Sequence, residues 1–315
     1  MMSTGRRHFL KQAGAVLAGG LFLPGISKAS GLFGEAAASW PVGIQLFTVF
    51  KPMNEDPEGT LKKIAAIGYK EVESAFSTRG GYYGYKPKEF KKLVESVGLK
   101  WRAHHAMGAP FKMPPPDKMP KGADGKPIEI PKMPNLLNLR DNYQQLVDDA
   151  AEAELSYLVC ASTPVSNLEE IKNSIEVFQK TGEAAKKAGV GFAYHNHATE
   201  FDAVEGGKTP YELVLSQTDK DLVKMELDLA WATKAGKDPV ALFKEHPGRF
   251  PLWHAKDIKS DLQTITEVGN GVVEFKRIFE AAKIAGLQYF FVEQDMAPSM
   301  ENVETGYKNL MKMIG

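Results

Sequence analysis

The 315-residue sequence lacks the features that mark several protein classes. It has one cysteine, Cys160, so no disulfide can form within the chain. Lysine plus arginine and aspartate plus glutamate both number 39, and this zero net charge argues against bulk attraction to nucleic acid or an anionic membrane. There is no G-x-G-x-x-G turn for a dinucleotide. With 43% hydrophobic and 25% charged residues, the composition is that of an ordinary globular protein.

The N-terminus has the pattern of an export signal. The pair Arg6-Arg7, followed by Phe9, Leu10 and Lys11, is similar to the twin-arginine consensus. An uncharged stretch at 13–26 comes next, and it is too short and too rich in glycine to span a bilayer. We therefore expect residues 1–38 to be a twin-arginine signal peptide and linker, and the protein to be periplasmic or otherwise exported. The alternative is a basic N-terminus with no targeting role.

The rest of the sequence alternates apolar runs with helical patterns. Eight runs are expected to form strands: 41–48, 69–73, 99–104, 157–161, 190–194, 222–227, 250–254 and 288–293. Strict alternation over this length predicts an α/β fold, a (β/α)₈ TIM barrel, as a single domain at 39–315. A long loop rich in proline and lysine is expected at about 108–135. A doubly wound open sheet is the alternative, but the first run lacks the glycine-rich turn that such sheets use for nucleotides.

Polar side chains gather where these runs end. They are Gln45, Glu73, His104, His105, Cys160, His195, His197, Asp228, His254, Lys256, Asp257, Glu293 and Asp295. Residues two apart on a strand point to the same side, so His195 and His197 are expected to project together. The carboxyl ends of barrel strands meet at one face, where the active sites of such barrels lie. Imidazoles and carboxylates without sulfur suit one divalent ion such as Mn²⁺, Fe²⁺, Co²⁺, Zn²⁺ or Mg²⁺.

From about residue 41 onward, several stretches together resemble one superfamily. They are Gly43-Ile44-Gln45-Leu46-Phe47-Thr48, Gly68-Tyr69-Lys70-Glu71-Val72-Glu73, Asp228-Leu229-Ala230-Trp231, His254-Ala255-Lys256-Asp257 and Gly269-Asn270-Gly271-Val272-Val273-Glu274-Phe275. The chain resembles the xylose isomerase-like barrels, the superfamily of sugar isomerases and epimerases. The resemblance implies one metal held by residues of strands five to eight. The implied ligands are His195, Asp228, His254 and Glu293. Relatives carry glutamate at the position of His195, which is the one departure.

The implied activity moves a proton between adjacent carbons of a small sugar or keto-sugar through a metal-stabilised ene-diolate. A base must lie within hydrogen-bonding reach of the carbon-bound proton. The resemblance assigns Glu293 as both ligand and base. From their strand-end positions we add Lys256, His197 and Glu73 as catalytic candidates. Candidate substrate-binding residues are Gln45, His105, Trp231 and Asp257.

Three other functions remain open at this stage. A lyase or dehydratase acting on a keto-sugar or 3-keto-glycoside would use the same enolate chemistry, and His195 in place of a glutamate base favours elimination. An abasic-site endonuclease would need three metals and a basic surface, which the neutral charge does not indicate. A non-catalytic sugar-binding barrel would keep the metal for structure. The expected partner is a small sugar, with neither nucleic acid nor a membrane span, and homo-oligomerisation is left open.

Single strand-end residues also have purely structural explanations. A lone histidine is often a hydrogen-bonding residue of the core, which applies to His104 and His105. Cys160 is expected to be a small buried residue. Glu226 and Asp295 are expected to be ion-pair partners.

Overall fold

A computed structural model of the chain describes residues 40–110 and 136–314. These residues belong to one compact unit, 39–315, which is described here by itself. The expected signal segment and most of the expected loop at 108–135 lie outside the described residues. No helix among the described residues is long and apolar enough to cross a membrane.

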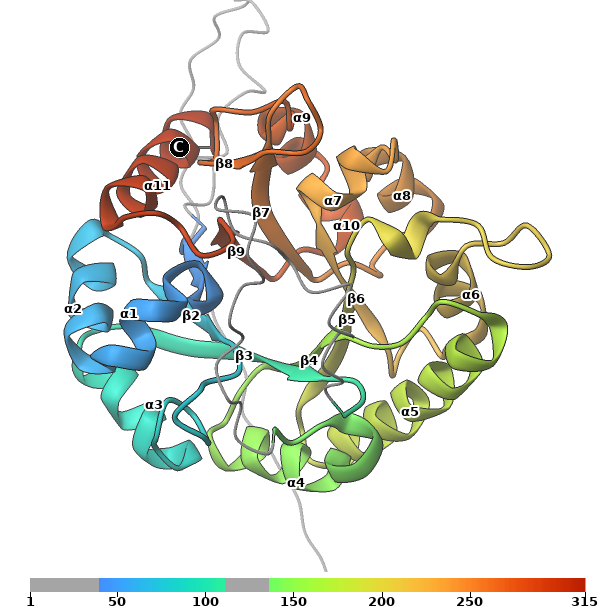
Figure 1. Cartoon of the computed structure of the whole chain (residues 1–315), viewed down its shortest axis with the longest axis horizontal. Coiled ribbons are helices and arrows are strands. Elements are labelled where there is room, and N and C mark those ends of the chain that lie inside the picture. Colours follow the sequence, from blue (N-terminus) through green and yellow to red (C-terminus); the bar gives the residue numbers. More distant parts are fainter. Residues whose placement is uncertain (1–39, 111–135, 315) are drawn as a thin grey trace, which may run out of the picture. The chain divides into compact units, whose positions relative to one another are not determined.

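Eight parallel strands close into a barrel, which confirms the predicted fold (Figure 1). Each strand pairs with the next along the chain, and the ring closes where β9 pairs with both β7 and β1. The barrel strands are β1 (Gly43–Gln45), β2 (Glu71–Ser74), β3 (Lys100–Met107), β4 (Tyr157–Ser162), β5 (Gly191–His195), β6 (Lys224–Asp228), β7 (Leu252–Ile258) and β9 (Tyr289–Glu293). A short extra strand, β8 (Ile265–Thr266), pairs antiparallel with the end of β7.

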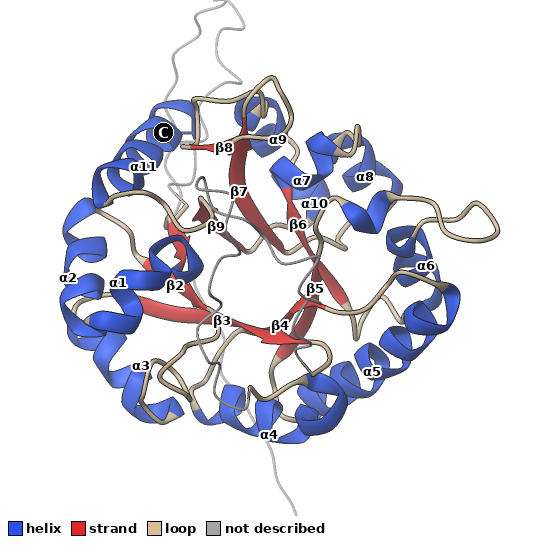
Figure 2. Cartoon of the chain, viewed as in Figure 1, coloured by secondary structure: helices blue, strands red, loops and turns tan. Residues whose placement is uncertain are grey.

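Helices surround the ring of strands, as Figure 2 shows. Among the described residues they are α1 (Phe50–Glu55), α2 (Pro57–Ile67), α3 (Pro87–Ser96), α4 (Leu139–Glu152), α5 (Leu168–Lys187), α6 (Pro210–Gln217), α7 (Leu229–Lys234), α8 (Pro239–Glu245), α9 (Phe275–Glu280), α10 (Ala282–Ala285) and α11 (Met300–Ile314). The described residues also include 3-10 turns at Leu46–Val49 and Thr199–Phe201. The helices α1 and α7 were not predicted from the sequence. Strand β1 is shorter than the run expected at 41–48.

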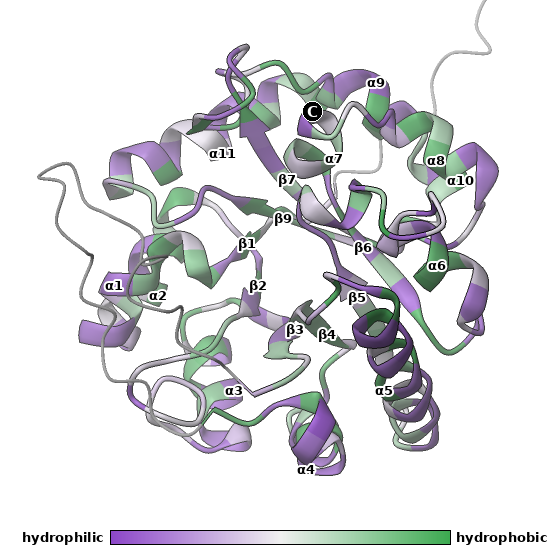
Figure 3. Ribbon diagram, turned by 45° about the vertical axis from the view of Figure 1, so that its right-hand side comes forward, coloured by the Kyte–Doolittle hydropathy of each residue, from purple (hydrophilic) through white to green (hydrophobic). Residues whose placement is uncertain are grey.

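Local sequence explains why the helices begin where they do. Asn167 caps α5 through a bond from the Glu170 N–H, and Thr209 and Glu212 form a capping box at α6. Along α5, apolar residues such as Ile171 and Phe178 recur at helical spacing and are buried against the barrel. Figure 3 accordingly shows both hydrophobic and hydrophilic positions along α5. These amphipathic helices pack a shell of apolar residues around the strands.

The inside of the barrel has a core of its own. Its apolar layer is formed by Ala103, Tyr157, Val159, Ala193, Leu252 and Phe291, which cluster separately from the residues packed between strands and helices. Two residues further along the strands, the inward-facing positions become polar. They are occupied by Gln45, Glu73, His105, His195, Glu226 and His254. Since residues two apart share one side of a strand, this polar layer lies directly beyond the apolar one.

Candidate active site

Strand register explains why the polar residues meet. Along adjacent strands, His195 is paired with Glu226, and Asp228 with His254. Lys256 is paired with Glu293 on the next strand of the ring. Glu226 and Asp228 are two apart on β6, as His254 and Lys256 are on β7, so each strand contributes at two depths. The site is therefore built in two tiers along the barrel axis.

The outer tier is centred on Lys256. Its Nζ lies 2.8 Å from Glu293 Oε2, 2.9 Å from Asp295 Oδ1 and 3.3 Å from Asp228 Oδ2. The side chain is buried, and burial by itself lowers the pKa of Lys256, but the three carboxylates outweigh it and the pKa is raised above its usual value. We call Asp228, Lys256, Glu293 and Asp295 the mouth cluster. Its lysine is a protonated cation surrounded by carboxylates.

His254 connects the mouth cluster to the tier beneath it. Its Nδ1 lies 2.7 Å from Glu293 Oε2, and its Nε2 lies 2.6 Å from Glu73 Oε2. Burial lowers the pKa of His254, whereas the carboxylates of Glu226 and Glu293 raise it, and the net pKa is well above the usual range. Both ring nitrogens of this fully buried side chain therefore face carboxylate oxygens.

The inner tier consists of Glu73, His105, His195, Glu226 and His254, which we call the inner cluster. Glu226 Oε2 lies 2.6 Å from His105 Nε2, 3.1 Å from His195 Nδ1 and 3.3 Å from His254 Nε2. Glu73 Oε2 lies 3.3 Å from His105 Nε2 and accepts a hydrogen bond from Gln45 Nε2 at 2.8 Å. Every member is buried.

The two carboxylates of the inner cluster differ in their acidity. Burial and the neighbouring charge of Glu226 raise the pKa of Glu73 to about 7. Burial acts in the same direction on Glu226, but His254 and His105 outweigh it and hold the pKa of Glu226 well below its usual range. Two carboxylates this close cannot both stay ionised in a buried site without positive charge nearby.

The potential metal ligands fall into two groups, each with ligand atoms within 4.8 Å of one another. Asp228, His254 and Glu293 form one group, and His105, His195, Glu226 and His254 form the other. The four ligands implied by the resemblance are therefore divided between the groups, because His195 belongs to the deeper one. Both groups fit a divalent ion in donor chemistry. Asp228 Oδ2 is buried without a hydrogen bond in the described part of the chain, and so are Glu73 Oε1 and Glu226 Oε1.

His197 and Trp231 lie at the rim of the barrel. The side chain of His197 is 43% exposed, and its ring centre lies 6.3 Å from that of Trp231. The Trp231 ring also lies 5.0 Å from Lys256 Nζ. Glu200 accepts the His197 backbone N–H at 3.0 Å and lies 3.7 Å from its Nδ1. His197 and Trp231 thus offer an accessible base and an aromatic face above the mouth cluster.

The carboxylate of Asp257 binds backbone N–H groups of a nearby loop. Its carboxylate accepts hydrogen bonds from the backbone N–H groups of Ile258, Gly269, Gly271 and Val273. A Cβ at Gly271 would lie 2.2 Å from Asp257 Oδ1, so only glycine permits this approach. The carboxylate is used in holding the loop after β8, and its predicted contact with substrate stays a prediction.

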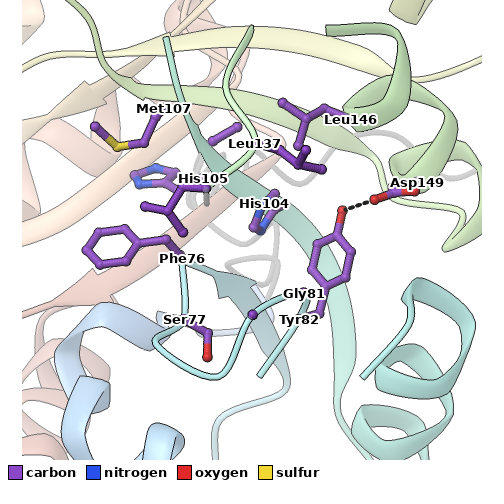
Figure 4. A pocket seen from close by; sticks show the side chains of 13 residues that line it. Phe76, Ser77, Gly81, Tyr82, His104, His105, Met107, Leu137, Leu146 and Asp149 are labelled. Carbon is purple, nitrogen blue, oxygen red and sulfur yellow. Dashed lines mark hydrogen bonds between the residues drawn. The ribbon is translucent and has the colours of Figure 1, made fainter. Parts of the chain in front are cut away.

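His104 and Cys160 are structural, as their simpler interpretation predicted. His104 Nδ1 lies 2.8 Å from Ser74 Oγ, and burial lowers the pKa of His104 to about 3. Cys160 is fully buried, and burial raises the pKa of its thiol. His105, the neighbour of His104, points into the barrel and lines a cavity of about 90 Å³ with Phe76 and Met107 (Figure 4).

The roles of two residues, Glu226 and Glu200, were not identified from the sequence. Glu226 was expected only as an ion-pair partner, yet its Oε2 is the atom on which three imidazoles converge. Its position two residues before Asp228 on the same strand was the available signal. Glu200 was not predicted at all, and its spacing of three residues from His197 could have indicated it. Glu73 was predicted as catalytic, but it lies fully buried beneath His254.

Comparison with known proteins identifies the family. A family model described as xylose isomerase-like TIM barrel matches residues 61–314. The chain belongs to this family. A solved sugar phosphate isomerase/epimerase from Parabacteroides distasonis ATCC 8503 is 27% identical, with a TM-score of 0.67 over 89% of this chain and 94% of that one. The resemblance drawn from the sequence is thereby confirmed at the level of the family.

Two further proteins are similar to parts or all of the fold. An inosose dehydratase from Geobacillus thermodenitrificans (strain NG80-2) is 28% identical over 159 residues, 44% of this chain and 52% of that protein. The match thus spans about half the length of this curated relative. D-psicose 3-epimerase from Clostridium cellulolyticum H10 is 13% identical with a TM-score of 0.60, covering 87% of this chain and 99% of that one, which shows a shared fold alone.

Proposed function

We propose that the chain is a divalent-metal-dependent isomerase or epimerase of a small sugar or keto-sugar, acting by proton transfer through an ene-diolate. The observation that carries the proposal is the mouth cluster, where Lys256 and Glu293 lie 2.8 Å apart at the carboxyl ends of two barrel strands. Membership of a family that contains isomerases and epimerases supports it.

Each residue of the site has a role in this proposal. Glu293 is the base: burial raises its pKa, but Lys256 and His254 outweigh burial and keep the carboxylate ionised. Lys256 donates a hydrogen bond to the substrate oxygen on which negative charge develops. His197 is the accessible proton carrier at the rim, and Trp231 packs against the apolar face of the sugar. Glu73 acts as a positioning residue because it reaches Glu293 only through His254.

A bound divalent ion would polarise the two substrate oxygens and so stabilise the ene-diolate. The ligands proposed from the resemblance are His195, Asp228, His254 and Glu293. The buried oxygen Asp228 Oδ2 makes no hydrogen bond in the described residues and lies 3.3 Å from Lys256 Nζ, so an ion bound here would replace or add to that ammonium. The identity of the ion, among Mn²⁺, Co²⁺, Zn²⁺, Fe²⁺ and Mg²⁺, is left to experiment.

A dehydratase acting on a keto-sugar is the second candidate, and two observations favour it. The matched curated relative is named inosose dehydratase. In addition, His195 stands where the epimerases have a glutamate, which removes one of the two bases that epimerisation uses. In this reaction Glu293 takes the proton next to the carbonyl, and Lys256 donates a proton to the departing hydroxyl.

The test is solvent-deuterium exchange with a panel of ketoses, aldoses, 2-keto-inositols and 3-keto-glycosides, followed by nuclear magnetic resonance. An isomerase incorporates deuterium beside the carbonyl and yields one isomer, whereas a dehydratase yields an unsaturated ketone. Glu293→Gln should slow either reaction by about 10²- to 10⁴-fold. Glu304→Gln, on the exposed face of α11, is the control. Sugar binding without exchange by any substrate would instead identify a non-catalytic barrel.

A further inference from the structure

The inner cluster is not explained by proton transfer at the mouth. It brings three imidazoles and two carboxylates together in the middle of the barrel, and none of the five residues is more than 8% exposed. Three imidazole nitrogens converge on one oxygen, Glu226 Oε2, at 2.6, 3.1 and 3.3 Å. A buried cluster of this kind needs a reason, because each charge placed in it is costly unless it is compensated.

Two buried oxygens of the cluster have no donor. Glu73 Oε1 and Glu226 Oε1 make no hydrogen bond with any of the described residues. Leaving a buried acceptor unpaired costs free energy, and native structures contain few such groups. These two oxygens belong to the same carboxylates whose other oxygens face the imidazoles. Both carboxylates therefore have one oxygen that could still bind a donor or a cation.

The spacing of the donor atoms matches a coordination sphere. Ligands of Zn²⁺ and similar ions lie about 2.0–2.2 Å from the metal, so neighbouring donors of a tetrahedral or octahedral site are about 2.9–3.5 Å apart. The separations around Glu226 Oε2, which run from 2.6 to 3.3 Å, need only a slight expansion to admit an ion. The ligand atoms of His105, His195, Glu226 and His254 all lie within 4.8 Å of one another.

Charge separates the inner cluster from the mouth cluster. At the mouth, the carboxylates of Asp228, Glu293 and Asp295 already surround a cation, the ammonium of Lys256. The inner cluster has the carboxylates of Glu73 and Glu226 but no lysine or arginine among the contacts that the described residues make with it. Without an ion, only protonated imidazoles can balance these carboxylates. A divalent ion would take over that role and bring the charge of two carboxylates and three neutral imidazoles to zero.

The outer contacts of the cluster are those of supported metal ligands. Metal-binding histidines commonly donate their other ring N–H to a carboxylate, which fixes the ring and raises its basicity. His254 meets this description when its Nε2 faces the inner cluster, because its Nδ1 lies 2.7 Å from Glu293 Oε2. Gln45 similarly donates to Glu73 Oε2 at 2.8 Å. His105 also lines the cavity of Figure 4.

We propose that the inner cluster is a cation site, in which His105, His195, His254 and Glu226, with Glu73 as a further ligand, bind one divalent transition-metal ion. The site is deeper than the one implied by the family resemblance and includes neither Asp228 nor Glu293 as a ligand. Three imidazoles select Zn²⁺, Co²⁺, Fe²⁺ or Mn²⁺ over Mg²⁺. The proposal competes with the ligand set implied by the resemblance, with which it shares His195 and His254. It does not rest on the proposed reaction, since it concerns where an ion binds and not which reaction follows.

The test uses the full chain, freed of metal with a chelator and reloaded with Co²⁺ alone. X-ray absorption fine structure then counts the imidazoles bound to cobalt. The inner cluster supplies three imidazoles. The ligand set implied by the resemblance, His195, Asp228, His254 and Glu293, supplies two, and the group of Asp228, His254 and Glu293 supplies one. This count needs no substitution, so it is unaffected if a variant fails to fold.

Matched variants on one strand give a second measurement. Glu226→Gln and Asp228→Asn alter fully buried carboxylates two residues apart on β6. We expect Glu226→Gln and His105→Gln to weaken Co²⁺ binding by more than about tenfold, and Asp228→Asn to retain it. Circular dichroism checks that each variant is folded.

Three results would overturn the proposal: a count of one or two imidazoles, loss of cobalt in Asp228→Asn but not in Glu226→Gln, or no cobalt bound by the wild-type chain. The deuterium-exchange assay is a separate readout. Cobalt held by three imidazoles in a protein that exchanges no sugar would refute the proposed function and support the inner site. Exchange by a protein with cobalt at the mouth would do the reverse.

Discussion

At the scale of single residues, the buried ammonium of Lys256 holds the mouth of the barrel together. We expect Lys256→Met to destabilise the protein by about 3–5 kcal/mol, because it leaves Glu293 and Asp228 buried without their partner. Urea unfolding followed by circular dichroism measures the change. Enzymatic exchange should be lost as well, since the hydrogen-bond donor to the substrate is removed.

Lys62→Met provides the comparison. Lys62 pairs with Glu58 on the exposed face of α2, where water screens the interaction, so its removal should change the unfolding free energy little. Equal stabilities of the Lys256→Met protein and the wild type would contradict the view that Lys256 neutralises the buried carboxylates.

The same scale shows what the sequence could predict about the site. Alternation along the strands correctly indicated that Asp228, His254, Lys256 and Glu293 point to one region. It could not indicate depth along the axis. The stagger of neighbouring strands sets which residues lie level, and stagger depends on closure of the whole barrel. The resemblance placed His195 with Asp228 in one ligand set, whereas its partner across the strands is Glu226.

At the scale of elements, two glycines inside helices should respond oppositely to a methyl group. In α11, a Cβ at Gly306 would make ordinary contacts, the nearest at 3.6 Å. Gly306→Ala should therefore stabilise the protein by about 0.5–1 kcal/mol, because alanine lowers the conformational entropy of the unfolded chain. In α5, a Cβ at Gly182 would lie 2.7 Å from the backbone oxygen of Leu222. Gly182→Ala should destabilise by about 1–3 kcal/mol.

Chemical denaturation of both variants and of the wild type measures the two changes in unfolding free energy. Each substitution puts the same residue into a helix interior, so helix propensity cancels between them and only the surroundings differ. Equal effects of the two would mean that α5 can move away from Leu222 without cost.

The elements themselves were largely predictable, and the errors are physical. All eight barrel strands were expected within a few residues of their observed bounds, because buried parallel strands appear as apolar runs. The first was expected to continue to residue 48. Instead the Gln45 side chain accepts a hydrogen bond from the Phe47 N–H and starts a 3-10 turn. At the end of β6, the Asp228 side chain caps α7 through the Trp231 N–H, and this helix was missed.

At the scale of the whole molecule, removal of the ion should lower thermal stability. An ion that binds only the folded chain adds about 2.7 kcal/mol at 100 times its dissociation constant. We therefore expect a chelator to lower Tm and Co²⁺ to restore it, as measured by calorimetry. Glu226→Gln should show a much smaller response to both. A Tm that does not change on chelation would argue against an ion bound at the barrel centre.

We also propose that the chain is exported through the twin-arginine pathway. Its signal residues lie outside the described part of the structure, so the test is functional. With residues 1–38 fused to a folded reporter in a bacterial host, the reporter should reach the periplasm. The double substitution Arg6→Lys and Arg7→Lys should retain it in the cytoplasm. Periplasmic reporter from the double variant would contradict twin-arginine export.

The polar layer inside the barrel implies that thermal stability and chemical reactivity place opposite demands on the same residues. Replacing a buried ionic cluster jointly by apolar residues of similar volume is often neutral or stabilising. The layer formed by Gln45, Glu73, His105, His195, Glu226 and His254 is such a cluster, resting directly on an apolar layer that could be continued upward. A barrel redesigned in this way should outlast the natural one on heating and do no chemistry. The natural sequence thus has lower stability at the barrel centre than an apolar core would give, and it retains ionisable side chains there.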